Sequence, residues 1–271
     1  MHECLVNGEI LDCLPISDRG FNYGDGLFET IAVIHGQPRW WQDHMDRLAA
    51  GCERLAIKTP PQAVLLREVQ TVSAGLSRCV VKIVLSRAGQ QRGYQPSIDA
   101  EPLRVVSSHS WAVGTGKQAE QGVSARTCEL RLSIQPALGG MKHLNRLEQV
   151  LASREMQGQG EQEGILLDTE GHVISAISAN LFLVFRGQLV TPRLDRSGVK
   201  GVLRARILKF FKARCELRRI SPEMLEDASE VFLCSAVRGI IPVTCIDGRD
   251  YEIGPVTREF QQWLTDSQGV N

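Results

Sequence analysis

Several patterns that carry common protein chemistry are missing from this sequence. Its eight cysteines form no C-x-x-C pair, and its six histidines show neither H-x-x-x-H nor H-E-x-x-H spacing. Zinc sites and metal-dependent hydrolases commonly use these spacings, so the sequence predicts no metal centre and no structural disulfide. No histidine stands beside a serine nucleophile motif, which removes the main support for a catalytic triad.

The chain also lacks net charge and long apolar runs. Acidic and basic residues balance at 31 each, so no long-range field favours nucleic acid or an anionic membrane. No apolar run reaches the roughly 18 residues of a membrane span, and residues 1–30 show no secretion-signal pattern. We therefore expect a soluble, cytoplasmic protein that acts on a small molecule.

Lysine is scarce as well. Only seven lysines occur among the 271 residues, and a lysine amine can attack a carbonyl group to form a Schiff base. Lys142 follows the pair Gly139-Gly140 and precedes a helical pattern, which would let its amine reach a cavity. Lys82, in an apolar strand pattern, is the alternative, because burial could lower the pKa of its amine. A strand lysine more commonly exposes the amine to solvent.

The first part of the chain shows alternating strand and helix patterns. Its length and 43% hydrophobic content can supply one large domain or two smaller ones, and we expect two. Asn7-Gly8 predicts a hairpin turn, since this dipeptide favours the backbone twist of tight hairpins. Further expected elements are strands at 28–34, 80–85 and 103–106, a helix from residue 43 that Asp43 caps, and a helix at 62–74.

A second domain is expected after a linker. Weak periodicity and two glycines at 109–121 predict the linker, which gives domains at 1–108 and 122–271. The second domain is expected to contain a helix after Lys142, strands at 164–167, 172–177 and 181–185, and helices at 202–213, 222–227 and 256–264. This mixture gives an α+β or mixed α/β fold class without selecting a topology.

The segment Lys142-His143-Leu144-Asn145-Arg146-Leu147-Glu148-Gln149-Val150 resembles the cofactor-lysine segment of 4-amino-4-deoxychorismate lyases. These are pyridoxal phosphate (PLP) enzymes of fold type IV, a group that includes branched-chain and D-amino-acid aminotransferases. Further family segments occur in order at 18–20, 23–30 and 241–243, so the resemblance covers nearly the whole chain. It implies a smaller N-terminal α/β domain, a larger C-terminal domain built on a barrel-like sheet, and PLP between them on Lys142.

The resemblance also assigns residues to the cofactor phosphate, a dianion that needs cations and backbone N–H donors. Arg47 matches the family arginine of the early helix. The segment before Arg204 matches a helix start, and a late segment matches one that closes round the phosphate. The implied cofactor contacts are, besides Lys142, Arg47, Ser175, Asn180, Gly201, Val202, Leu203, Ser235 and Ala236.

Ser175 is where the chain departs from the family. In aminotransferases and many lyases of this fold, a glutamate shortly before an Asn-Leu-Phe segment pairs with the pyridine nitrogen, and the matching residue before Asn180-Leu181-Phe182 is Ser175. A carboxylate keeps that nitrogen protonated, whereas a hydroxyl only hydrogen-bonds to it, so the cofactor becomes a weaker electron sink. Ser175 is therefore compatible with elimination, counts against transamination, and leaves open an inactive relative.

The substrate of such a lyase carries two carboxylates, which call for cations. Arg92 lies in a segment, 86–94, that resembles the substrate loop of the lyases, and Arg87 is a further candidate there. Asp25, in a Gly-Asp-Gly turn, is assigned no acid or base role. The resemblance implies substrate contacts for Phe28, Thr30, Arg92, Tyr94, Asn145 and Arg146, although one of the last two could only pack the helix after Lys142.

The sequence therefore predicts an aminodeoxychorismate lyase activity, with Lys142 as the catalytic residue. The reaction is a PLP-dependent elimination that converts 4-amino-4-deoxychorismate to 4-aminobenzoate and pyruvate for folate synthesis. The resemblance also implies a homodimer. An aminotransferase of the same fold, acting on D-amino or branched-chain amino acids, is the alternative, and a noncatalytic PLP-binding homologue is a third.

Overall fold

The computed structural model describes residues 4–89, 93–97, 99–111 and 115–268. The chain divides into two compact units. Unit 1 consists of residues 1–112 and 142–145, and unit 2 of residues 113–141 and 146–271. Lys142 therefore belongs to unit 1, although the segments on both sides of 142–145 belong to unit 2.

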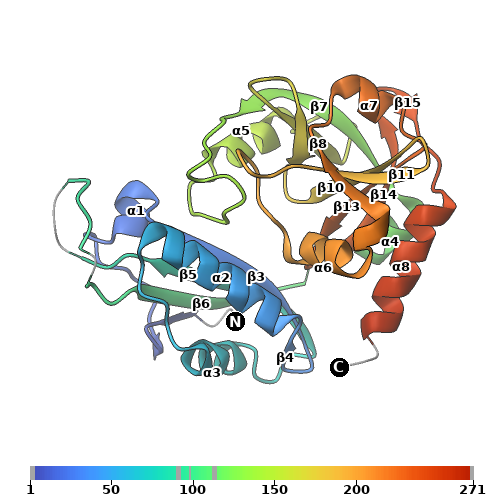
Figure 1. Ribbon diagram of the computed structural model, residues 1–271. Coiled ribbons are helices and arrows are strands. Elements are labelled where there is room, and N and C mark those ends of the chain that lie inside the picture. The colour runs from blue at the N-terminus through green and yellow to red at the C-terminus, as the bar shows by residue number, and fades with distance from the viewer. Residues whose placement is uncertain (1–3, 90–92, 98, 112–114, 269–271) are drawn as a thin grey trace. The chain divides into compact units, whose positions relative to one another are not determined.

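Unit 1 contains a six-stranded antiparallel sheet in the order β2-β1-β6-β5-β3-β4 (Figure 1). The hairpin expected at Asn7-Gly8 is confirmed, because Leu5 pairs with Ile10 and both turn residues have positive φ. The strands are β1 (Cys4–Val6), β2 (Glu9–Ile10), β3 (Gly26–Ile34), β4 (Gln37–Pro38), β5 (Arg78–Ser86) and β6 (Leu103–His109).

Strand β3 has two different faces, as the period of two along a strand requires. Glu29 and Ile31 lie on the buried face, on which helix α2 (Trp41–Leu55) packs (Figure 1). Gly51 of α2 comes so close that a Cβ there would lie 2.8 Å from Leu27 Cδ1. Phe28 and Thr30 lie on the other face and are half-buried. The remaining helices of the unit are α1 (Arg19–Tyr23) and α3 (Gln62–Val72).

Helix α2 begins earlier than the sequence predicted. Its N-cap is Trp40, with φ +51°, and no side chain among the described residues caps it. Asp43 lies inside the first turn, so the expectation that Asp43 caps the helix is wrong. A carboxylate in the first turn still favours the helix, because the N-terminal end carries partial positive charge.

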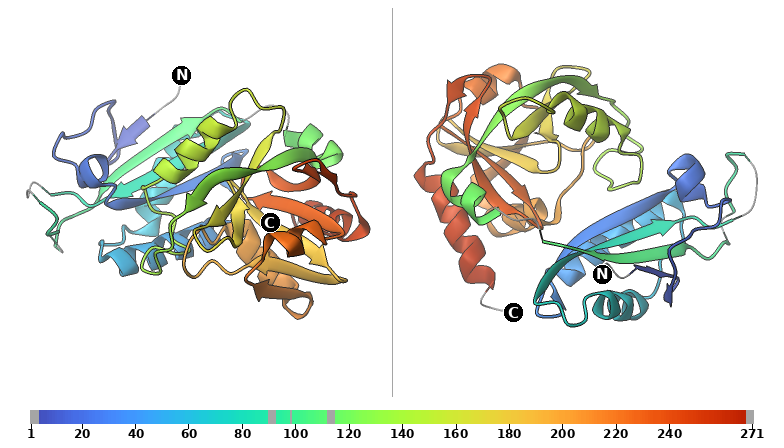
Figure 2. Two further views of the ribbon diagram at one scale, coloured as in Figure 1. Left: turned by 90° about the horizontal axis from the view of Figure 1, so that it is seen from above. Right: turned by 180° about the vertical axis from the view of Figure 1, so that it is seen from behind.

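Unit 2 is built on a nine-stranded mixed sheet in the order β12-β11-β10-β13-β14-β7-β8-β9, with β15 beside β14. Strand β9, at one end of this order, also packs against β10 and β11, so the sheet curls back on itself (Figure 2). The expected barrel-like sheet is confirmed. Its strands are β7 (Val123–Leu132), β8 (Glu163–Asp168), β9 (Val173–Ala176), β10 (Asn180–Phe185), β11 (Gln188–Pro192), β12 (Cys215–Arg218), β13 (Glu230–Ser235), β14 (Gly239–Ile246) and β15 (Arg249–Asp250).

The curled sheet encloses an apolar core. Alternate residues of adjacent strands, among them Leu181, Leu183, Val231 and Leu233, are almost fully buried there. The helices are α4 (Thr115–Gln121), α5 (Leu147–Glu155), α6 (Val202–Phe210), α7 (Pro222–Glu226) and α8 (Pro255–Gln268), with a 3-10 turn at Lys212–Arg214. Helix α4 occupies residues for which the sequence predicted a linker.

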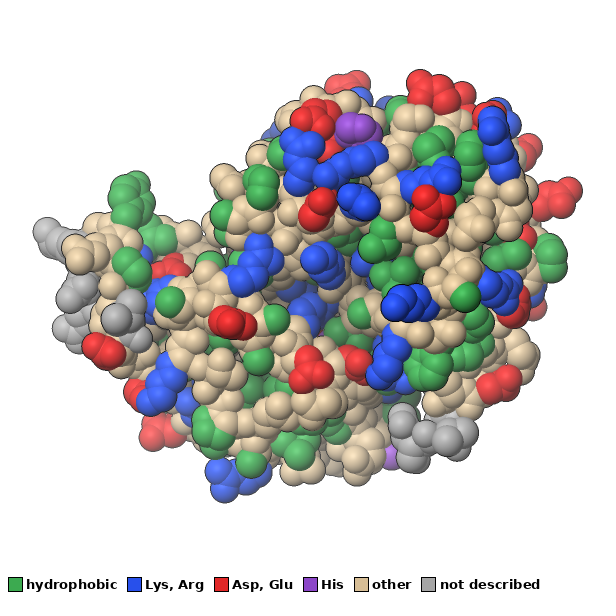
Figure 3. Space-filling view, in the orientation of Figure 1, with side chains coloured by type: hydrophobic (Ala, Val, Ile, Leu, Met, Phe, Trp, Pro, Cys, Tyr) green, Lys and Arg blue, Asp and Glu red, His purple; other side chains and the backbone are tan. Residues whose placement is uncertain are grey.

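The described surface agrees with the balanced composition. Side chains of both charge signs are spread over the face drawn in Figure 3. Among the helices that the structure describes, none has the length and apolar character of a membrane span.

Candidate active site

The segment that contains Lys142 is held beside the first residues of strand β3 by main-chain contacts within unit 1. Phe28 N donates to Lys142 O at 3.0 Å, and Leu144 N donates to Gly26 O at 3.0 Å. Leu27 and His143 form an antiparallel bridge between these two hydrogen bonds. The amine Nζ of Lys142 lies 4.0 Å from the centroid of the Phe28 ring. The backbone of the candidate catalytic lysine is therefore held rigidly, and its amine rests on a half-buried aromatic side chain.

Asn145 ties the same segment to the turn before β3. Its Nδ2 donates to Gly24 O at 3.2 Å. Gly24 has φ +65°, and a Cβ there would lie 2.3 Å from Asn145 Oδ1, so only glycine suits both the backbone and the contact. The observed role of the Asn145 amide is therefore to hold the Lys142 segment against this turn.

Lys82 approaches the same aromatic ring from strand β5. It pairs with Thr30 across the two strands, and its Nζ lies 5.4 Å from the Phe28 ring centroid. Its side chain is exposed, whereas that of Lys142 is half-buried. Phe28, Thr30 and both lysines therefore share one face of the unit 1 sheet.

Arg47 lies on α2 and contacts the opposite face of β3 through Glu29. Arg47 Nε donates to Glu29 Oε1 at 2.8 Å and Nη2 to Oε2 at 2.5 Å, while His44 Nδ1 lies 2.6 Å from Oε2. Burial alone would raise the pKa of Glu29, but the charge of Arg47 and the hydrogen bonds from His44 and Arg47 outweigh burial and lower that pKa to about 2. Glu29 is therefore an ionised carboxylate inside the protein.

Glu29 was missed in the sequence analysis, although the strand pattern contains a signal for it. Leu27, Glu29 and Ile31 are alternate residues of one strand, and the apolar members predict that the whole set faces the core. A carboxylate on a core face needs a cationic partner. The pattern could therefore have directed attention to the arginine of the next helix.

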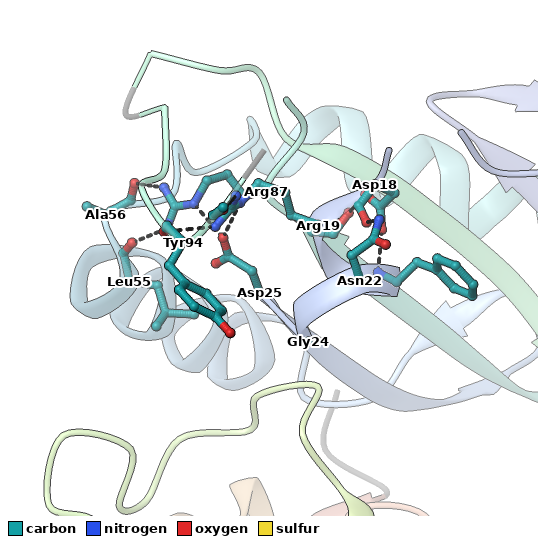
Figure 4. Close-up of polar contacts among 12 residues, drawn as sticks. Asp18, Arg19, Asn22, Gly24, Asp25, Leu55, Ala56, Arg87 and Tyr94 are labelled. Carbon is teal, nitrogen blue, oxygen red and sulfur yellow. Dashed lines mark hydrogen bonds and ion pairs between the residues drawn. The ribbon is translucent and has the colours of Figure 1, made fainter. Parts of the chain in front are cut away.

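A second buried charge cluster surrounds Asp25 (Figure 4). Arg19 Nε and Arg87 Nε both donate to Asp25 Oδ2 at 2.9 Å, and Figure 4 shows the two side chains converging on this carboxylate. Arg87 also donates to Ala56 O and Leu55 O at the end of α2. All three of its donor nitrogens are engaged inside unit 1, so Arg87 is an internal anchor rather than a substrate contact.

Arg19 extends this cluster to the loop that resembles the lyase substrate loop. Its Nη1 donates to Gly93 O at 2.9 Å and its Nη2 to Tyr94 O at 3.1 Å. The side chain of Tyr94 is 86% exposed, with its ring centroid 5.6 Å from that of Tyr23. Arg92, the first candidate for the substrate carboxylates, lies outside the described residues.

In unit 2, the start of helix α6 has the features of an anion site. Gly201 is its N-cap residue, and no side chain within the described part of the chain caps the helix. The first turn, with Val202 and Leu203, therefore presents backbone N–H groups, which suit a phosphate. Gly201 N donates to Asn180 Oδ1 at 3.0 Å, and Asn180 Nδ2 donates to Val199 O at 2.8 Å. Asn180 thus fixes the backbone that leads into the helix.

The other unit 2 candidates lie on nearby strand ends. Asn180 begins β10 and pairs with Cys234, which precedes Ser235 at the end of β13, so Ser235 and Ala236 lie at the same end of this strand pair as Asn180. Ser235 Oγ accepts a hydrogen bond from Arg238 N at 3.1 Å. Ser175 is buried in β9, opposite Leu166. The structure thus brings the expected phosphate contacts of unit 2 together.

The residues before and after the Lys142 segment are held within unit 2. A Cβ on Gly139 would lie 2.6 Å from Asp195 O, and Gly140 exchanges hydrogen bonds with Gly198 and Lys200. The glycine pair therefore permits close backbone packing. Arg146 is the N-cap residue of α5, and burial lowers its pKa to about 10 against the opposing charge of Glu148.

One group of side chains resembles a metal site. Ligand atoms of Asp168, Glu170 and His172 lie within 4.8 Å of one another. Both oxygens of Glu170 are paired with Arg196, at 2.6 and 2.8 Å, and Asp168 Oδ1 accepts the N–H groups of Glu170 and His172. These contacts organise the turn between β8 and β9, and the arginine charge opposes a bound cation.

Each unit by itself carries donors of the kind that a phosphorylated aldehyde cofactor such as PLP requires. Lys142 supplies an amine, Arg47 a cation, and the uncapped start of α6 a set of backbone N–H groups. Family comparison agrees with this class of site. The family model Amino-transferase class IV matches residues 26–246, and the chain belongs to this family.

Within the family, two lyases are particularly similar to this chain. An aminodeoxychorismate lyase from Vibrio harveyi is 36% identical over 263 residues, which cover 94% of this chain and 97% of the relative. The crystal structure of 4-amino-4-deoxychorismate lyase from Pseudomonas aeruginosa matches with a TM-score of 0.92 and 41% identity, over 97% of this chain and 98% of that one. The resemblance to these fold type IV lyases is confirmed.

Aminotransferases of the family are more distant. A putative branched-chain-amino-acid aminotransferase from Methanocaldococcus jannaschii is 28% identical over 96% of this chain and 94% of its own length. The mixed α/β fold of type IV is therefore shared widely, whereas the two lyases share more of the sequence.

Proposed function

We propose that this protein is an aminodeoxychorismate lyase that uses PLP to convert 4-amino-4-deoxychorismate to 4-aminobenzoate and pyruvate. The product 4-aminobenzoate would serve folate synthesis, and the compartment would be the cytoplasm. The observation that carries the proposal is the rigidly held Lys142 with its amine on Phe28. Identity of 36% and 41% to two lyases over nearly the whole chain supports the same activity.

Lys142 would act both as the attachment point of the cofactor and as the proton carrier. When bound, PLP supplies a carbonyl that bonds amines and a ring that accepts electrons. The neutral Lys142 amine would take the proton from C4 of the substrate, and the C3–oxygen bond would break as the carbocycle becomes aromatic. The resulting ammonium would return a proton to the methylene carbon of the enolpyruvate, which gives pyruvate.

The remaining candidates would bind and orient. Arg47, Ser235, Ala236 and the start of α6 would hold the cofactor phosphate, with Asn180 fixing Gly201, Val202 and Leu203. Ser175 would face the ring nitrogen as a neutral partner, which favours elimination over transamination. The proposed substrate contacts remain Phe28, Thr30, Arg92, Tyr94, Asn145 and Arg146.

We also propose that the protein is a homodimer. Residues 10–23 of unit 1 carry a series of exposed large apolar side chains, including Ile10, Ile16 and Phe21. Apolar side chains gathered on a surface commonly mark a protein interface. Sedimentation equilibrium of the purified protein should give twice the chain mass, and replacement of Ile16 and Phe21 by serine should lower the association constant. A monomeric wild-type protein would contradict this part of the proposal.

The activity is tested by incubating the PLP-loaded protein with freshly prepared 4-amino-4-deoxychorismate. Pyruvate and 4-aminobenzoate should appear in equal amounts, and the Lys142→Ala variant should release neither. Lys82→Ala is the matched control, because Lys82 approaches the same ring but should not carry the cofactor. Cofactor bound without either product would leave an aminotransferase or a noncatalytic homologue, and retained lysine-bound cofactor absorbance in Lys142→Ala would move the attachment to Lys82.

A further inference from the structure

Glu29 and His44 form a buried pair behind Arg47. The side chains of Glu29 and His44 are 1% and 0% exposed, and they come from strand β3 and helix α2 of the same unit. His44 Nδ1 lies 2.6 Å from Glu29 Oε2, while Arg47 contacts both carboxylate oxygens from one turn further along α2. One carboxylate thus joins a buried imidazole to a partly exposed guanidinium.

The surroundings of His44 indicate which of its two ring nitrogens carries a proton. His44 Nε2 is buried and has no hydrogen-bond partner among the described residues. A proton on Nε2 would be a buried, unsatisfied donor, so the proton belongs on Nδ1, from which it is donated to Glu29. Arg47, which forms an ion pair with Glu29, supplies positive charge beside the buried carboxylate.

This arrangement determines the orientation of the Arg47 guanidinium. Glu29 engages its Nε–H and one Nη2–H, a two-point contact that fixes the guanidinium plane. A guanidinium has five N–H donors, so one arginine can contact a second anion while it holds a carboxylate through two of them. An arginine held in place loses less conformational entropy when it binds an anion than a mobile one does.

We propose that Glu29 and His44 are positioning residues for the cofactor phosphate: Glu29 holds the Arg47 guanidinium in the orientation that binds phosphate, and His44 holds Glu29. The inference rests on the proposed function, because that function makes Arg47 a phosphate ligand. Neither residue needs to touch the cofactor.

The test compares two probes, PLP and pyridoxal, which lacks the phosphate. The protein is freed of cofactor and titrated with each probe, and binding is followed by the absorbance of the lysine-bound cofactor. Glu29→Gln keeps the shape of the side chain but removes its charge. It should weaken PLP binding about tenfold or more and leave pyridoxal binding unchanged, as expected when the orientation of one side chain is lost.

Glu68→Gln is the matched control. Glu68 is also a buried carboxylate of unit 1 and contacts an arginine, Arg104, through both of its oxygens. The control should therefore share any general effect of losing a buried ion pair, yet bind both probes as the wild type does. The ratio of PLP to pyridoxal affinity then separates positioning of Arg47 from damage to the fold.

His44 variants extend the test to the second positioning residue. His44→Asn retains an N–H donor near the place of Nδ1 and should keep most of the phosphate preference, whereas His44→Leu removes the donor and should lose it. Glu29→Gln combined with Arg47→Met should be no worse for PLP than Arg47→Met alone, since Glu29 acts through Arg47.

Two results would overturn the inference. One is an equal loss of PLP and pyridoxal affinity in Glu29→Gln, which would indicate a structural role alone, and the other is no loss of either. The readout uses no substrate. If the wild type binds PLP with a phosphate preference but releases no products, the lyase proposal fails and the positioning proposal stands, whereas failure to bind PLP would contradict both.

Discussion

The two units offer the proposed reaction different kinds of groups. Unit 1 supplies charge: the Lys142 amine, and Arg47 and Asp25 in clusters whose opposite charges are paired inside the unit. The candidates of unit 2 are mostly neutral, namely hydroxyls, an amide and the backbone N–H groups at the start of α6. Unit 1 therefore depends on charge balance and unit 2 on close backbone packing, so different substitutions should damage them.

The largest effect on stability is expected for Asp25→Ala in unit 1. Arg19 and Arg87 are each 4% exposed, and without Asp25 both guanidiniums lose their shared counter-charge. Breaking a buried ion pair by removing one partner costs about 3–5 kcal/mol. Urea denaturation should show a loss of this size, whereas Glu259→Ala, which breaks the exposed pair with Arg214, should cost about 1 kcal/mol or less. Equal losses would remove the proposed dependence on buried charge.

The next effect is a pH dependence that arises from Glu29. Its pKa is lowered from 4.5 to about 2 in the folded protein, so the folded state favours the ionised form. The stabilisation is present above pH 4.5 and is lost as the pH falls from about 4.5 to about 2. The difference in unfolding free energy between wild type and Glu29→Gln should shrink over this range by about 3 kcal/mol. Parallel pH profiles for the two proteins would show that the charge of Glu29 does not contribute.

Unit 2 should be sensitive to a single methyl group at the start of α6. In Gly201→Ala the new Cβ would lie 2.1 Å from Asn180 Oδ1, so the Asn180 amide and the helix start must separate. Overpacking of this kind costs about 1–3 kcal/mol, and the PLP affinity should fall with it. Thermal unfolding and cofactor titration measure both. Gly160→Ala, where a Cβ would meet nothing within 4 Å, is the control and should behave as the wild type.

The smallest effect is expected from a change in the electronics of the cofactor. Ser175→Glu should keep the ring nitrogen protonated and shift the absorption spectrum of the lysine-bound cofactor. Ser175→Ala should leave the nitrogen neutral and change the spectrum less. Absorption spectra of the two variants beside the wild type provide the measurement. A spectrum unchanged by Ser175→Glu would remove Ser175 from the ring site.

Local pattern predicted those elements whose side chains alternate regularly. The expected strands of unit 1 are confirmed. They could be predicted because one face of each strand is buried along its length, as in β3 and β5, and this burial produces a regular alternation in the sequence. Strand β7 was missed, and its pairing with β8 shifts register between Thr127 and Arg131, which interrupts the period of two. A bulge of this kind depends on the partner strand and leaves no simple pattern in its own sequence.

Helix α4 is another element that the local sequence pattern did not predict. Its residues are polar and include a glycine, so their periodicity is weak. Two side chains of α8 support it: Arg258 donates to Glu120 O and Gln261 to Ala119 O. These partners lie about 140 residues further along the chain, which a local pattern does not reveal.

Some residues of the candidate site could be predicted from the sequence, whereas the contacts of others are shown only by the structure. Lys142 and the phosphate segments were found because they resemble continuous family motifs. The Asp25 cluster was only partly anticipated, since its two arginines come from residues 19 and 87 and a sequence does not reveal which carboxylate they share. Arg87 was therefore considered as a further candidate for a substrate contact, whereas burial and three internal acceptors give it a structural role.

The four-residue segment 142–145 has a consequence for how this chain can be divided. The chain passes between the units at 112–113, 141–142 and 145–146, so neither unit is one continuous stretch. A fragment that ended at residue 112 would lack the neighbour of Gly26 and Phe28, and the complementary fragment would carry Lys142 without that support. Recombination at any point between residues 28 and 142 therefore separates the lysine from the backbone groups that hold it.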